Sequence, residues 1–240
     1  IDGLVHVAVH VQVGISRLER GFERVFGHGR SVVECEQNGV GHGQHVIAPP
    51  SRNDGMDRLR AGIALYNAGH YLAAHEPLEA RWLEDPAGER EDCLQGLIQA
   101  TAAVHKSKTG NRAGARGLAD SAVEYLQDCA RIGVEPLSEW LARLAADPAL
   151  GTREQPPDLW LDDKLVTVDD LRFPAAGAAA RALAETRDDE IVSAAVEYAT
   201  ADLESGSETS PLVTLTLDYV RKGDPIIRQR LQEHVERRRM

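Results

Sequence analysis

The stretch AAHEPLEARW (residues 73–82) places one histidine and two acidic residues within a helical pattern of apolar residues. At about 100° per residue, His75 lies at the middle of an apolar arc. Glu79 lies inside this arc, about 40° from His75, and Glu76 lies at its rim, about 100° away. The apolar members of the arc are Tyr71, Leu72, Leu78, Trp82 and Leu83. We therefore expect His75 and Glu79 to point into the protein.

The composition around this stretch favours an all-α fold. Hydrophobic residues make up 42% of the 240 residues, but aromatic residues only 5%. Ala, Leu and Val fill most apolar positions, which is typical of many small helices. Helical patterns cover residues 57–66, 71–84, 91–108, 113–129 and 137–146. Since short connections imply antiparallel neighbours, we predict a small antiparallel helical bundle.

Turn residues divide these helices. Asn67 and Gly69 tolerate the left-handed turn that ends a helix, and Gly110-Asn111 breaks the third helix. Further helical patterns lie near residues 175–186, 188–205 and 211–222. A last helix is opened by Asp224 as cap and Pro225 at its first position. These later helices predict a C-terminal helical extension.

The chain divides into four predicted parts. Residues 1–55 hold nine of the 21 glycines and five of the nine histidines, and valines alternate from Val5 to Val13 as in a strand. The acidic, Ala-rich composition begins at Met56, so we interpret residues 1–55 as a mis-assigned start, poorly ordered, whose histidines bind no metal. A bundle domain follows over 56–148. A Pro-rich acidic linker or extended wrap covers 149–174, and the helical extension covers 175–240.

The charge is acidic and uses arginine in place of lysine. The net charge is −11, of which −10 falls on residues 56–240, and only four of the 27 basic residues are lysines. This composition resembles that of proteins from salt-loving archaea, although an acidic mesophilic surface remains open. Such a surface repels nucleic acid and anionic membranes, so we expect neither as a partner. We interpret Arg237, Arg238 and Arg239 as cations at a helix C-terminus, in preference to nucleic-acid contacts.

The three cysteines predict no disulfide framework and no zinc ribbon. Cys35, Cys93 and Cys129 are odd in number and form no C-x-x-C pair. We expect them to be reduced thiols in a cytoplasmic protein. No apolar run approaches the roughly 20 residues that a membrane span needs.

A second polar group lies on the next predicted helix. His105 falls on its inward arc, so it too is expected to face the interior. If residues 71–84 and 91–108 form an antiparallel hairpin, His105 lies about one turn from His75, beside Tyr71. In the same register Gly96 lies opposite Glu79 and lets the two backbones approach closely.

Three interpretations of these groups compete. Burying an unpaired carboxylate or imidazolium costs several kcal/mol, so each group must have a partner. The first interpretation is a hydrogen-bonded His-Glu-Tyr network that fixes helix register. The second is a pocket for a small molecule or a protein partner, and the third is a metal site. Whether the protein is an enzyme stays open.

The metal interpretation compares the stretch with zinc hydrolases of the H-E-x-x-H type. Glu79 replaces the second histidine, Glu76 would be the general base, and His105 would supply a third ligand. The ion would be divalent, such as zinc; otherwise no cofactor is predicted. Pro77 argues against this site, because a proline inside a helix loses an amide hydrogen bond. It is acceptable only where the helix begins near Ala74 or kinks. No G-x-S-x-G motif or phosphate-binding loop competes.

Three segments carry a family resemblance. NAGHYLAAHEPLEARW, CLQGLIQATAAVHKSKTGN and GARGLADSAVEYL resemble domain-of-unknown-function family 309 over about residues 59–127. The motif residues are His75, Glu76, Glu79, Trp82, Gln95, Gly96, Ile98, Gln99, His105 and Asn111, whereas position 77 is not usually proline in this family. The resemblance implies an all-α bundle with the motif helix at its centre, but no established activity. Segments after about residue 150 look like an extension found in halophilic archaeal relatives.

The preferred functional hypothesis is a helical module without known chemistry. Its buried His/Glu cluster would organise the core or line a pocket formed by Tyr71, His75, Glu79, Trp82, Gln99 and His105. The alternative is a metal-dependent hydrolase with His75, Glu79 and His105 as ligands and Glu76 as the catalytic base. A small molecule, a protein, or a second copy in a homo-oligomer remain open as partners.

Overall fold

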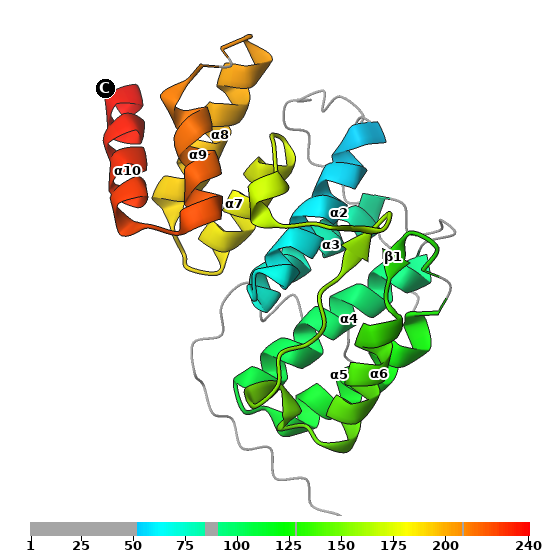
Figure 1. The fold of residues 1–240 in the computed structure, drawn as a ribbon. Helices are drawn as coiled ribbons and strands as arrows, with labels where there is room; N and C mark the ends of the chain where they lie inside the picture. The colour runs from blue at the N-terminus through cyan, green and yellow to red at the C-terminus, as the bar shows by residue number, and fades with distance from the viewer. Residues whose placement is uncertain (1–51, 85–90, 128, 208) are drawn as a thin grey trace, which may run out of the picture. The chain divides into compact units, whose positions relative to one another are not determined.

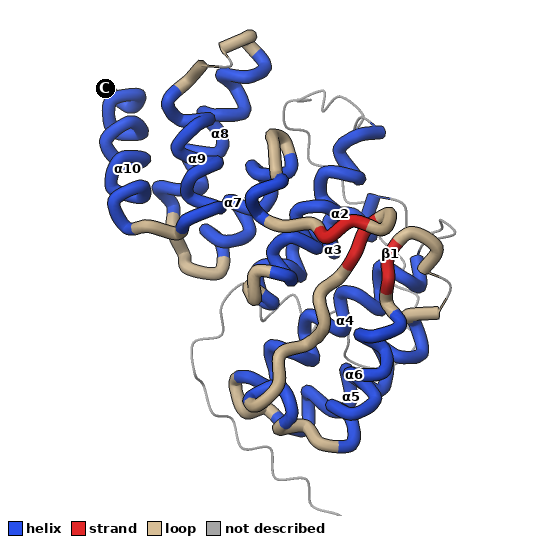
Figure 2. Tube along the Cα trace, viewed as in Figure 1, coloured by secondary structure: helices blue, strands red, loops and turns tan. Residues whose placement is uncertain are grey.

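A computed structural model describes residues 52–84, 91–127, 129–207 and 209–240 (Figure 1). Helices dominate this part of the chain, together with a small sheet of two-residue strands (Figure 2). The prediction of an all-α bundle with a C-terminal helical extension is confirmed. The strand predicted over Val5–Val13 and Cys35, expected to be a reduced thiol, lie outside the described residues.

Five helices form the bundle, and each contacts the next one along the chain. They are α2 (Arg52–Asn67), α3 (Tyr71–Glu84), α4 (Glu91–Lys108), α5 (Arg112–Tyr125) and α6 (Glu135–Ala146). Their mutual contacts bury mainly Ala, Leu and Val side chains. The predicted order of helices is therefore the observed one.

The predicted turn residues act as expected. Gly69 has φ +81° just after α2, and Gly110 has φ +83° just after α4. This left-handed conformation is easily accessible to glycine because it lacks a Cβ atom. Asn111 then caps α5 by accepting a hydrogen bond from the Gly114 amide at 2.9 Å.

Two predicted helix ends are wrong. α2 begins at Arg52, five residues before the predicted start at residue 57, whereas the division of the chain at residues 55 and 56 stays a prediction. α5 ends at Tyr125, four residues before the predicted end at Cys129. The apolar pattern continues past this end because Leu126, outside the helix, is also buried.

Gly96 has a different neighbour from the one predicted. A Cβ atom at this position would lie 2.9 Å from the Leu126 side chain and 3.0 Å from the Leu126 amide nitrogen. Glycine is therefore needed where α4 meets the chain leaving α5. The expectation had assigned the close approach to α3.

Residues 153–167, which we call the wrap, lie against α2. Asn67 Nδ2 donates to the carbonyls of Leu159 and Val166, both at 2.9 Å, and the Leu159 amide donates to Asn67 Oδ1 at 2.8 Å. One asparagine thus satisfies three backbone groups of an irregular segment. Within the wrap, β2 (Trp160–Leu161) pairs antiparallel with β1 (Ile132–Gly133) and with β3 (Lys164–Leu165). The 3-10 turns η1 (Leu150–Thr152) and η2 (Val168–Asp170) flank it.

Four helices follow the wrap: α7 (Ala175–Glu185), α8 (Glu190–Glu204), α9 (Pro211–Lys222) and α10 (Pro225–Arg239). α7 contacts both α2 and α3, so this helix joins the extension to the bundle. Asp224 caps α10 through the Ile226 amide at 2.8 Å, and Pro225 occupies its first turn, as predicted. No helix of the described segments is long and apolar enough to cross a membrane.

The C-terminal arginines contact the extension itself. Arg238 forms an ion pair with Asp202 of α8, and its guanidinium lies 5.4 Å from the centroid of the Tyr198 ring. Arg237 lies 3.8 Å from Glu233, one turn earlier on α10. Hydrogen bonds from Ser210 and Arg238 lower the pKa of Asp202. Arg238 therefore stabilises the packing of α10 on α8.

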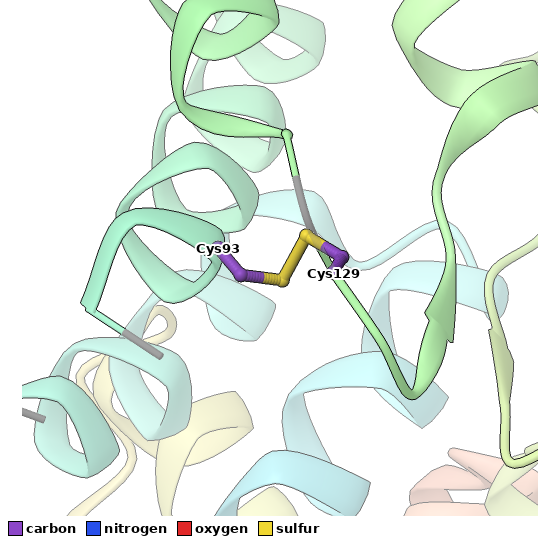
Figure 3. Close-up of a disulfide and its surroundings, with 2 residues drawn as sticks. All are labelled: Cys93 and Cys129. Carbon is purple, nitrogen blue, oxygen red and sulfur yellow. A yellow bond between two sulfur atoms is a disulfide. The ribbon is translucent and has the colours of Figure 1, made fainter. Parts of the chain in front are cut away.

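Cys93 and Cys129 form a disulfide (Figure 3), which corrects the expectation of reduced thiols. The bond joins the first turn of α4 to the loop between α5 and β1, with a Cα–Cα distance of 5.4 Å. The spacing of the cysteines could not predict this disulfide, because the two residues are 36 positions apart and belong to no motif. Disulfides are rare in reducing compartments, so the expected cytoplasmic location loses the support of its cysteine argument.

We expect reduction of this disulfide to lower the free energy of unfolding by about 3–4 kcal/mol, because the bond restricts a long loop in the unfolded chain. The measurement is urea unfolding with and without a thiol-free reductant. The double variant Cys93→Ser/Cys129→Ser is the control: it should match the reduced protein and not respond to the reductant. Equal stability of the oxidised and reduced wild type would contradict the expectation.

Candidate functional site

The motif helix α3 buries His75 as the sequence predicts. Only 4% of this residue is exposed, and α2, α4 and α7 all contact the helix that carries it. Glu79, one turn later, keeps 21% of its side chain exposed and so lies at the edge of the interior. The two residues therefore share the inward side of α3, with the imidazole deeper than the carboxylate.

Burial controls the charge of both groups. Desolvation lowers the pKa of His75 to about 4 and raises the pKa of Glu79. His75 is therefore neutral at pH 7, and its Nδ1 lies 3.8 Å from Glu79 Oε2, beyond hydrogen-bond distance. From residue type and distance alone, this contact would be classified as an ion pair. The burial of the imidazole makes it a contact between a neutral ring and a carboxyl group.

Pro77 is accommodated inside α3. The helix runs from Tyr71 to Glu84, as predicted, so Pro77 lies well inside it and not in its first turn. Because proline has no amide hydrogen, the Ala73 carbonyl receives no helical hydrogen bond from residue 77. The Pro77 ring is buried and turned toward α7, where it lines a pocket.

The other predicted site residues separate into different environments. Gln99 of α4 is 2% exposed, and within the described segments its Oε1 accepts no hydrogen bond. Trp82 Nε1 is also buried without an acceptor among those residues. His105 is partly exposed on α4.

No group of three or more His, Cys, Asp or Glu side chains in the described segments is arranged to hold a metal ion. The predicted set of His75, Glu79 and His105 stays a prediction.

Tyr71 belongs to a cluster with the wrap. Its hydroxyl donates to Gln155 Oε1 at 3.2 Å, and Lys108 Nζ donates to the same oxygen at 3.1 Å. Lys108 Nζ also lies 5.5 Å from the centre of the Tyr71 ring, and the Tyr66 ring meets that ring edge-on at 5.3 Å. Gln155 is 84 residues away in sequence. No local pattern indicated this partner.

A pocket of about 500 Å³ opens on the side of α3 that carries Glu76. Its walls come from α2, α3, α7 and α8, and Pro77 and Ala80 of α3 lie in its lining beside Glu76. The lining residues from the other elements are Asp57, Arg58, Pro174, Gly177, Ala178, Arg181, Ala182, Glu185, Val196 and Thr200. His75 and Glu79 do not line it. The sequence singled out Glu76 but could not place α7 and α8 opposite it.

Comparison with known proteins matches part of the bundle to a protein family. Residues 59–118, a quarter of the chain, match a family model described as Domain of unknown function (DUF309). The match includes all of α3 and α4 and confirms the predicted resemblance, but the description states no activity. A search of curated proteins found no match.

The neutral state of His75 predicts a stability that depends on pH. The folded-state pKa, about 4, lies below the unfolded value of 6.5, so only the unfolded chain takes up a proton as pH falls from 6.5 to 4. This residue therefore destabilises the fold at low pH, by roughly 2 kcal/mol between pH 7.5 and pH 5. The His75→Gln variant should lose that much less stability over the same range.

The measurement is urea unfolding of both proteins at pH 7.5 and pH 5. Glu79 is present in both and largely cancels from the comparison. The variant His234→Gln, on α10, is the matched control and should behave as the wild type. Identical pH dependence in wild type and His75→Gln would show that His75 is not held neutral.

Proposed function

We propose that this protein is a small-molecule-binding helical module in which α3 has two roles. On its inward side, His75 and Glu79 organise the core. On its other side, Glu76 and Pro77 form part of a ligand pocket. The observation that carries the proposal is the pocket of about 500 Å³ lined by the motif residue Glu76.

The size and lining of the pocket support this function. Small-ligand sites commonly enclose about 300–1,000 Å³ and combine an apolar lining with a few polar groups. Here the partly exposed Ala80 and Ala178 give apolar surface, and the buried residues Pro77, Ala182 and Val196 complete the apolar lining. Charged side chains from three helices surround this surface. Such a lining suits a small ligand with both apolar and charged parts.

The bundle holds the pocket walls in a defined position. Arg58 Nε lies 3.2 Å from Glu84 Oε1, so an ion pair joins α2 to α3 beside the pocket. Gly62 brings the same helices close together, because a Cβ atom there would lie 2.5 Å from Leu78 Cγ. The pocket is thus formed by packed helices, and binding need not order a loop.

We expect the variant Ala178→Trp to block the pocket. Its binding of small charged fragments should weaken at least tenfold, because the indole would occupy ligand space. The measurement is a protein-observed NMR screen with anionic, cationic, zwitterionic and neutral fragments. Hits should shift amide resonances of α3 and α7 in the wild type.

Ala142→Trp is the matched control, since it makes the same change at an exposed position of α6. It should bind as the wild type does. Hits that Ala178→Trp leaves unchanged would contradict the proposal. Elemental analysis of untagged protein tests the hydrolase alternative: about one metal per chain, lost in a folded His75→Ala variant, would favour that alternative.

A further inference from the structure

We infer that the pocket binds a small aliphatic zwitterion, a compound that carries an ammonium group and a carboxylate on a short apolar frame. This inference rests on the proposed function and names its ligand class. Three observations support it: the charges on α7, the ion pair that occupies Arg58, and the apolar surface between the charged groups.

Arg181 and Glu185 lie one turn apart on α7, and both line the pocket. Residues four apart on a helix have Cβ atoms about 6 Å from each other. The order, arginine before glutamate, is the less favourable one for a helical ion pair. Across the described segments, neither side chain forms a salt bridge or a side-chain hydrogen bond. The pocket therefore presents adjacent positive and negative groups that a ligand could bridge.

Arg58, the other lining cation, is held by Glu84 at 3.2 Å. Arg181 is consequently the group best placed to receive a ligand carboxylate. Glu76 on α3 lines the same pocket as Glu185 on α7. Glu185 thus borders the space in which an ammonium group would lie.

The charge balance disfavours ligands with a single sign of charge. The lining holds Asp57, Glu76 and Glu185 against Arg58 and Arg181. An anion without an ammonium group would leave Glu185 unmatched, and an amine without a carboxylate would leave Arg181 unmatched. A zwitterion satisfies both signs.

The surface between the charged groups selects an aliphatic frame. Ala178, Ala182, Pro77 and Val196 supply methyl and ring carbons, while Thr200 is the lining residue with a hydroxyl. The area of apolar contact would add to affinity in proportion to the chain length of the ligand. Arg181 and Glu185 are exposed, so we expect a modest affinity that falls as salt is added.

The test titrates the full chain with three matched probes: 5-aminopentanoate, pentylamine and pentanoate. NMR titration at low ionic strength should show 5-aminopentanoate binding at least tenfold more tightly than either single-charge probe. Arg181→Gln should remove the advantage of 5-aminopentanoate over pentylamine. Glu185→Gln should reduce its advantage over pentanoate. Arg230→Gln on α10 and Glu139→Gln on α6, both at exposed positions, are matched controls and should change nothing.

The outcomes separate this inference from the proposed function. Pentylamine or pentanoate binding as tightly as 5-aminopentanoate, and still blocked by Ala178→Trp, would overturn the zwitterion but leave the pocket intact. The same holds if other fragments bind there and 5-aminopentanoate does not. If no fragment of any charge shifts the resonances of α3 or α7, both proposals fail. Thermal unfolding confirms that each variant is folded before its affinity is compared.

Discussion

His75 is held within α3 at 4% exposure, and α2, α4 and α7 all contact that helix. Burial on this scale removes water from the imidazole, so the folded protein favours its neutral form at pH 7. The rotation of α3 follows from this arrangement. With His75 and Glu79 turned inward, Glu76 lies at the rim of the inward arc, and Glu76 and Pro77 line the pocket together with residues of α7. The packing of the core thus determines which residues of α3 are left to line the pocket.

Local sequence patterns predicted the helices well because their ends depend on residues next to them. Gly69, just after α2, has the positive φ of a helix-ending turn, and Asn111 caps α5. The predicted range 211–222 is the observed α9. The inward position of His75 also followed from helical periodicity. These features need no knowledge of distant parts of the chain.

Features that depend on distant contacts were not predictable in this way. The partner of Tyr71 is Gln155, and the disulfide joins cysteines 36 residues apart. The pocket needs α7 and α8 beside α3, yet nothing in residues 73–82 indicates which helices cover Glu76. Periodicity gives the direction of a side chain but not the identity of the element it meets. The salt-loving composition stays a prediction of the sequence alone.

The wrap shows how a segment rich in proline and charge is held in place. Its backbone lacks the continuous hydrogen bonds of a helix, and Asn67 supplies three of the missing partners. Leu159 and Leu161 are buried at the same place, so apolar contact and hydrogen bonding act together. A single residue at the end of α2 thereby connects two distant parts of the sequence.

The disulfide also changes the topology of the bundle. Cys93 and Cys129 close a covalent ring that contains nearly all of α4 and the whole of α5. A protease that cuts once within residues 94–128 would open this ring without releasing a fragment. The nicked chain would keep its full mass on a non-reducing gel and separate into two pieces only after the bond is reduced.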